Sequence, residues 1–179
     1  MNRFILPLGV FVLLAIVLAI GIKHSPEKGT IQSPLIGKAA PQFELPVLTD
    51  SGRTFRSSEL KGRWYVFNVW ATWCGGCRDE HSALVEISKQ ARVPLIGLDW
   101  KDEDPRAMQW LAELGNPYEV VAVDKEGRTA IDWGVYGAPE TFLVNPQGIV
   151  VYKYIGPLTL EAWQTLFVPR LPPPQAARS

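Results

Sequence analysis

Residues 64–77, WYVFNVWATWCGGC, decide the fold of this chain. The first half, residues 64–70, is aromatic and β-branched, which predicts a buried strand. A helix is expected from about Cys74 to Ala91, because apolar residues recur on one helical face after the cysteines. Two cysteines three positions apart therefore stand where a core strand gives way to a helix.

The segments around this stretch alternate between strands and helices. We expect strands at 93–99 and 118–123, hairpins at 42–55 and 141–155, and helices at 105–115, 129–133 and 159–167. Asp104 is predicted to cap the helix that begins at Pro105, and Thr159 to cap the last one. Alternating strands and helices predict an α/β fold with helices flanking a central parallel sheet, to which the hairpins add antiparallel strands.

Composition narrows the possible functions. Lys plus Arg and Asp plus Glu both number 18 among the 179 residues, so net charge gives no reason to expect a nucleic acid partner. The chain has two cysteines and two histidines, His24 and His81, and a structural zinc site would lack its fourth ligand. His81 is predicted to be an exposed helix residue. We therefore predict neither a metal site nor a cofactor.

The ends of the chain differ in composition from its middle. Residues 4–22 are uncharged and apolar over a length that spans a bilayer as a helix, which predicts a single transmembrane anchor. A cleaved signal peptide would have a shorter apolar segment and a small-x-small cleavage site. The expected organisation is a tip at 1–3, the anchor, a linker at 23–34, a folded domain at 35–168 and a disordered Pro-rich tail at 169–179. Positive charges flank the anchor almost evenly, so charge alone does not orient it.

The two cysteines are placed for thiol chemistry. A thiolate attacks disulfides, and an ordinary cysteine titrates near pH ~8.5. The unpaired N–H groups of a helix N-terminus stabilise a thiolate, so Cys74 is predicted to be the nucleophile and Cys77, one turn later, the resolving thiol. The alternative, two small residues in a core helix, fits poorly with Gly75 and Gly76 between them.

Other residues are predicted to shape the site. Trp73 precedes the nucleophile and is expected to pack there or shield the thiols. Pro139 follows Ala138 at the start of a predicted strand. The acids Asp99 and Glu140 are candidates for tuning a thiol pKa, while solvated or capping carboxylates remain an equal alternative for both.

Four segments together resemble a known family. They are GKAAPQF at 37–43, NVWATWCGGCR at 68–78, GLDWKD at 97–102 and GVYGAPET at 134–141. With the N-terminal anchor, they resemble the thiol:disulfide interchange proteins of the DsbE/CcmG type, within the thioredoxin-like superfamily. The resemblance covers about residues 36–163 and implies a thioredoxin-like fold with an N-terminal β-hairpin extension.

The resemblance also implies a function. It implies a cytoplasmic tip at 1–3 and a domain on the periplasmic side of a bacterial inner membrane that acts as a reductant in cytochrome c maturation. Electrons would come from a DsbD-like membrane thiol transporter and pass to the CxxCH disulfide of apocytochrome c or to a haem-assembly protein. It further implies a cis Pro139 facing the redox-active Cys74–Cys77 disulfide, with Glu140 as the acid beside it and the backbone at Ala138 available to pair with substrate.

One position departs from that family, and other functions stay open. Both residues between the cysteines are glycine, where the family has a bulkier residue or a proline, and this pair helps set the redox potential. The alternatives are a peroxiredoxin-like peroxidase, suggested by residues 37–43, a non-catalytic chaperone, and a disulfide reductase serving another pathway.

Overall fold

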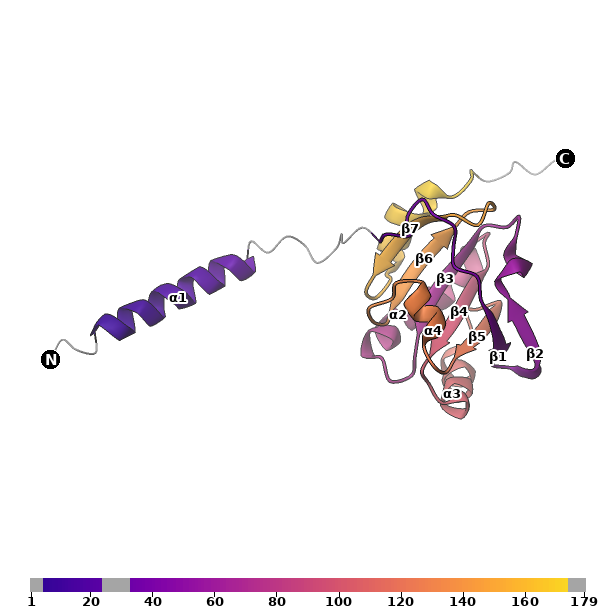
Figure 1. The fold of residues 1–179 in the computed structure, drawn as a ribbon, viewed down its shortest axis with the longest axis horizontal. Helices are drawn as coiled ribbons and strands as arrows, with labels where there is room; N and C mark the ends of the chain where they lie inside the picture. Colours follow the sequence, from indigo (N-terminus) through magenta and orange to yellow (C-terminus); the bar gives the residue numbers. More distant parts are fainter. Residues whose placement is uncertain (1–4, 24–32, 174–179) are drawn as a thin grey trace. The chain divides into compact units, whose positions relative to one another are not determined.

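The computed structural model describes residues 5–23 and 33–173, and the chain forms two compact units, residues 1–31 and 32–179 (Figure 1). The first unit contains helix α1, Ile5–Lys23, which overlaps the predicted anchor. In the two ranges that the structure describes, no helix has both the length and the apolar character needed to cross a membrane. The anchor therefore stays a prediction. Most of the predicted linker, and residues 174–179 of the predicted tail, lie outside the described residues.

The second unit is built on a mixed sheet, as the sequence predicts. Among the described residues seven strands form it, in the order β2-β1-β5-β4-β3-β6-β7. Neighbours β3, β4 and β5 are parallel, while the other neighbours pair antiparallel. The strands are β1 (Glu44–Val47), β2 (Asp50–Arg56), β3 (Tyr65–Trp70), β4 (Leu95–Trp100), β5 (Val120–Asp124), β6 (Glu140–Val144) and β7 (Val150–Ile155).

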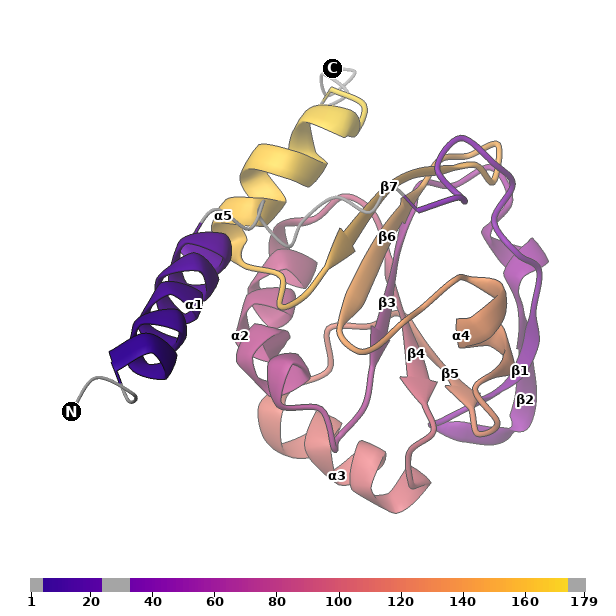
Figure 2. The same ribbon diagram turned by 60° about the vertical axis from the view of Figure 1, so that its left-hand side comes forward.

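Helices cover both faces of this sheet. Helices α2, α3 and the C-terminal segment lie on one face, and α4 lies on the other (Figure 2). Each face has its own apolar core, one containing Leu84, Trp110 and Phe167, the other Phe43 and Trp133. The helical segments are η1 (Ser57–Leu60), α2 (Gly75–Gln90), α3 (Asp104–Leu114), α4 (Arg128–Asp132), α5 (Leu160–Ala162), the π-helix η2 (Trp163–Phe167) and the 3-10 turn η3 (Val168–Arg170).

The register of β3 with its two neighbours determines which loops lie next to the cysteines. The residues of β3 are all buried, because helices cover both faces of a central strand, which is why the sequence there is a continuous apolar run. In the sheet register Trp70 is paired with Asp99 of parallel β4, and Val69 with Glu140 of antiparallel β6. The loops after β3 and β4 and the loop before β6 therefore meet at one end of the sheet.

Two helix ends test the predicted caps. Thr159 accepts a hydrogen bond from the Ala162 N–H at 3.1 Å, so that cap is confirmed. The cap predicted for Asp104 is wrong, because α3 begins at Asp104 itself, after Glu103, and no side-chain capping bond forms. The Asp104 carboxylate instead pairs with Lys125, with Nζ and Oδ1 2.5 Å apart. This partner comes from the segment after β5, which local sequence could not reveal.

Candidate active site

The two cysteines lie at the start of α2 and form a disulfide. Cys74 is the N-cap residue of the helix, and its Sγ accepts a hydrogen bond from the Cys77 N–H at 3.1 Å. The Cα atoms are 5.3 Å apart. Cys74 is 6% exposed and Cys77 2%, so the cysteine at the positive end of the helix is also the less buried residue. This geometry suits Cys74 for attack and Cys77 for resolution.

The loop before β6 packs directly on this helix start. The Ala138–Pro139 peptide bond is cis, as the resemblance predicts. A Cβ added to Gly76 would lie 3.0 Å from Pro139 Cδ and 3.2 Å from Pro157 Cγ, whereas one added to Gly75 would meet nothing within 4 Å. The absence of a side chain at Gly76 thus permits the loops that carry Pro139 and Pro157 to approach the start of α2 closely, and Pro139 faces the cysteine pair. Ala138 packs against the core cluster that contains both cysteines.

Glu80 is a site residue that sequence reasoning missed. It lies one turn beyond Cys77 in α2 and is 1% exposed. Its Oε1 accepts a hydrogen bond from Asn68 Nδ2 at 2.8 Å, and its Oε2 one from the Leu158 N–H at 2.7 Å. Burial nevertheless raises the pKa of the Glu80 carboxyl to about 7. The sequence did hold a signal for this residue, since Glu80 is an acid on the same helical face as Cys77 and Leu84, which are both buried.

Asp99 lies at the end of β4 and is fully buried. Within residues 33–173 neither of its carboxyl oxygens has a hydrogen-bond partner. Burial and the nearby Asp102 carboxylate raise the pKa of Asp99 to about 7. The structure thus places Asp99 among buried groups near the end of β3, as a carboxyl that is neutral over part of the physiological pH range.

Glu140 belongs to a buried ion pair. Its Oε2 is 2.8 Å from Lys153 Nζ, and both side chains are at most 2% exposed. Its Oε1 accepts a hydrogen bond from the Tyr136 N–H at 3.1 Å, and Lys153 Nζ donates to the Gly134 carbonyl at 2.8 Å. Glu140 and Lys153 therefore hold the loop that carries Pro139.

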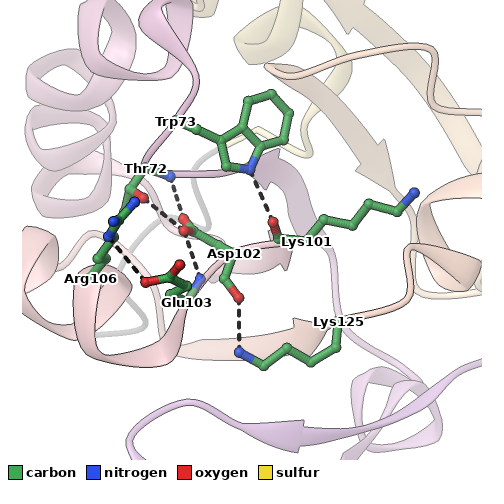
Figure 3. Close-up of polar contacts among 7 residues, drawn as sticks. All are labelled: Thr72, Trp73, Lys101, Asp102, Glu103, Arg106 and Lys125. Atoms are coloured by element: carbon green, nitrogen blue, oxygen red, sulfur yellow. Dashed lines mark hydrogen bonds and ion pairs between the residues drawn. The ribbon is translucent and has the colours of Figure 1, made fainter.

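Trp73 lies at the surface beside the disulfide. Its side chain is 55% exposed and contacts the Trp100 ring, with centroids 5.5 Å apart. Its Nε1 donates a hydrogen bond to the Lys101 carbonyl at 3.1 Å (Figure 3). Its orientation is thus fixed by the loop after β4, and it presents an aromatic surface next to Cys74.

His81 is not exposed, so that prediction is wrong. It is buried between α2 and α3, where Nδ1 accepts a hydrogen bond from Trp110 Nε1 at 3.0 Å and Nε2 lies 2.8 Å from the Gly115 carbonyl. Because Trp110 can only donate, Nδ1 is the acceptor and Nε2 carries the proton. Burial lowers the pKa of His81. Both ring nitrogens therefore make hydrogen bonds that join α2 to α3 and the residue after it.

Comparison with known proteins agrees with this geometry. Residues 36–153 match the AhpC/TSA family. A thiol:disulfide interchange protein DsbE from Allochromatium vinosum is 44% identical over 162 residues, covering 90% of this chain and 88% of its own length. One from Pseudomonas aeruginosa is 40% identical over 165 residues, covering 92% of this chain and 90% of its own.

A solved structure extends the similarity to three dimensions. A thiol:disulfide interchange protein of the thioredoxin family from Chlorobium tepidum superposes with a TM-score of 0.58 at 28% identity. The match covers 69% of this chain and 88% of that one. The fold is therefore thioredoxin-like, with β1 and β2 as the predicted N-terminal hairpin. The chain belongs to the AhpC/TSA family and, within it, to the thiol:disulfide interchange proteins named DsbE, and its chemistry is thiol–disulfide exchange.

Proposed function

We propose that this chain is a periplasmic reductant of cytochrome c maturation, held at the bacterial inner membrane by residues 4–22. It reduces the CxxCH disulfide of apocytochrome c, or of a haem-assembly partner, and a DsbD-like membrane thiol transporter re-reduces it. The observation that carries the proposal is the contact between Gly76 and Pro139. It brings the segment 134–141, the most specific of those that resemble the family, against the cysteine pair.

The exchange proceeds in two steps. The Cys74 thiolate attacks one sulfur of the substrate disulfide, so that a mixed disulfide forms, the substrate S–S bond breaks and the released thiolate takes up a proton. Cys77 then loses its proton and attacks Cys74 Sγ, which re-forms the Cys74–Cys77 bond and releases the second substrate thiol. Two electrons pass to the substrate, and the protein is left oxidised.

Glu80 is suited to accept the proton of Cys77. At 2% exposure Cys77 has little access to water, so its deprotonation needs an internal base. Glu80 lies one helical turn away, and a pKa of about 7 lets its carboxylate take up a proton near neutral pH. The hydrogen bonds from Asn68 and Leu158 hold that carboxylate in place.

The neighbouring surface is suited to an extended peptide. Ala138 makes no backbone hydrogen bond to any other described residue, so its N–H and C=O are available to a substrate strand. The exposed Trp73 directly precedes Cys74 in the chain and offers an aromatic contact to a bound peptide.

Trapping tests the proposal. A Cys77→Ala variant of the full chain cannot resolve the mixed disulfide, so its substrates should remain bound through Cys74. Non-reducing electrophoresis and mass spectrometry of membranes from cells that make c-type cytochromes should then identify apocytochrome c or a haem-assembly protein. The Cys74→Ala/Cys77→Ala double variant is the matched control and should capture nothing.

The same experiment separates the alternatives. Capture of other proteins without any apocytochrome or haem-assembly protein would point to a reductase of another pathway and contradict the proposal. A chaperone would keep its function in a Cys74→Ser variant, whereas the proposed reductant should lose all activity. A peroxidase would consume peroxide with steady turnover, which we do not expect from a thiol that is resolved by a neighbour three residues away.

A further inference from the structure

The loop between β4 and α3 is tied to the active-site loop by one carboxylate. Asp102 Oδ2 accepts a hydrogen bond from the Thr72 N–H, and Oδ1 accepts one from the Thr72 hydroxyl at 2.7 Å (Figure 3). Oδ1 also accepts from the Glu103 N–H at 2.8 Å. Asp102 is only 9% exposed, and these three donors offset the cost of burying its charge. Thr72 is two residues before Cys74.

A second contact joins the same two loops. The Trp73 indole N–H donates to the Lys101 carbonyl at 3.1 Å (Figure 3). Lys101 has φ +51°, a left-handed conformation that costs a residue with a side chain about 1–2 kcal/mol. In this conformation the Lys101 carbonyl accepts from Trp73, Asp102 reaches Thr72, and the Lys101 N–H donates to the Asp124 carbonyl at 3.1 Å, so these contacts offset the unfavourable backbone.

The loop is also held from the side away from the disulfide. Lys125 Nζ donates to the Asp102 carbonyl at 2.8 Å and pairs with Asp104 Oδ1 at 2.5 Å. Lys125 follows β5, so the main chain of Asp102 is fixed to the sheet while its side chain holds Thr72. The carboxylate therefore has little freedom to follow a movement of the active-site loop.

We infer that Asp102 is a positioning residue for thiol–disulfide exchange, acting through its hydrogen bond with the Thr72 hydroxyl to place Cys74 at the start of α2. The inference rests on the proposed role of Cys74 as the attacking thiol. A turn closed by the Cys74 N–H and the Ala71 carbonyl, 3.2 Å apart, has Thr72 within it, so fixing Thr72 fixes this turn. When the turn is fixed, the Cys74 sulfur keeps its place beside the Cys77 N–H, which stabilises the thiolate.

Thr72 allows a test in which no charge changes. Removing the Asp102 carboxylate would take a negative charge away from the thiolate, and this alone would lower the Cys74 pKa. Thr72→Val keeps the carboxylate and the side-chain shape but removes the hydroxyl that donates to Oδ1. Thr72→Ser restores the hydroxyl. Comparing the two variants therefore separates positioning from electrostatics.

The measurement is the pH dependence of Cys74 alkylation by iodoacetamide in the reduced full chain. Thr72→Val should raise the Cys74 pKa and slow alkylation at pH 7 by about three- to tenfold, because a displaced sulfur loses part of the stabilisation that the helix N-terminus gives the thiolate. Thr72→Ser should return both values to those of the wild type. Glu103→Ala is the matched control from the same loop, because among residues 33–173 its side chain pairs with exposed Arg106 alone; it should alkylate like the wild type.

The outcomes decide the inference clearly. An unchanged pH profile in Thr72→Val would overturn it and leave Asp102 with a purely structural role. An equal loss in Thr72→Val and Thr72→Ser would also overturn it, since the hydroxyl would then be irrelevant. Alkylation needs no partner protein, so failure to trap an apocytochrome would contradict the proposed pathway without affecting this result. Faster labelling of Cys77 than of Cys74 in the wild type would overturn both.

Discussion

At the scale of single residues, burial of the Asp99 carboxyl lowers the stability of the fold when that carboxyl is charged. A carboxylate without a hydrogen-bond partner is costly inside a protein, and within residues 33–173 neither oxygen of Asp99 has one. Its folded pKa of about 7 lies above the ordinary value of 3.8, so the folded state binds a proton that the unfolded chain has released. The contribution of Asp99 to stability is therefore fullest below pH 3.8 and is lost as the pH rises through about 7.

We predict that Asp99→Asn makes the domain more stable at pH 8, by about 1–3 kcal/mol, because the neutral amide avoids the buried charge. At pH 4 the wild type and the variant should have nearly equal free energies of unfolding, since Asp99 is then protonated. Urea unfolding at several pH values checks this. The pH dependence contributed by Glu80 is common to both proteins and cancels in the difference. A variant that is less stable at pH 8 would show that the carboxylate has a partner.

At the scale of elements, a buried ion pair joins β6, β7 and the loop before β6. Lys153 of β7 contacts Glu140 of β6, donates to Gly134 and lies 4.4 Å from the centre of the Tyr136 ring. These contacts fix both ends of the segment that leads to Pro139. Loss of either partner is expected to destabilise the fold strongly, because the remaining charge would be buried without a partner.

We predict that Lys153→Met destabilises the domain by about 3–5 kcal/mol, because Glu140 is left buried without its cation. The double variant Lys153→Met/Glu140→Gln should recover much of this loss, since the unpaired charge is gone. Equilibrium urea unfolding measures both. Arg56→Met, which breaks an exposed pair with Glu44, is the matched control and should cost far less. If the single and double variants lost equal stability, the ion pair would not be the cause.

At the scale of the whole molecule, the chain separates into two units with different roles. Residues 32–179 form one compact unit that contains the sheet, both apolar cores and every residue of the site. Residues 1–31 contain α1, whose described side chains are apolar and exposed, among them Leu8, Phe11 and Leu14. We therefore expect the second unit to carry the exchange chemistry by itself.

We predict that a chain beginning at residue 33 folds and reduces a soluble disulfide peptide at the rate of the full chain. It should, however, leave the membrane fraction, whereas the full chain should stay there after alkaline carbonate extraction. Fractionation and a peptide reduction assay measure the two properties separately. Release of the full chain by carbonate would contradict the anchor, and loss of reduction in the shorter chain would contradict the independence of the second unit.

Local sequence was sufficient for several features whose signal lay within a few residues, although not for the cap at Asp104. Strand β3 was predicted because a strand covered on both faces needs a continuous apolar run. Cys74 and Cys77 were predicted because a spacing of three at a helix start brings two sulfurs together. The pattern around Thr159 gave a correct cap, but the π-helix that follows at 163–167 was not predicted, because apolar spacing alone does not separate helix types.

The partners of the buried polar groups come from distant parts of the chain. Thr72 and Asp102 are 30 residues apart in sequence, and Glu80 and Leu158 are 78 apart. The prediction that His81 is exposed failed because Trp110, which covers it, lies on another helix and is distant in sequence. Such contacts exist only after the sheet has brought the ends of β3, β4 and β6 together.

The sequence by itself determined the α/β class, the cysteine pair and its place at a helix start, because these depend on periodicity and spacing along one segment. The tertiary structure decided the partners and the burial of each acid near the site, including Glu80 and Asp102, which the sequence did not single out. It buried Glu80 between Asn68 and Leu158 and, within residues 33–173, left Asp99 without a hydrogen-bond partner. It also paired Glu140 with Lys153 and set Asp102 against Thr72. The physical reason is that the state of a carboxyl group depends on its burial and its neighbours in space.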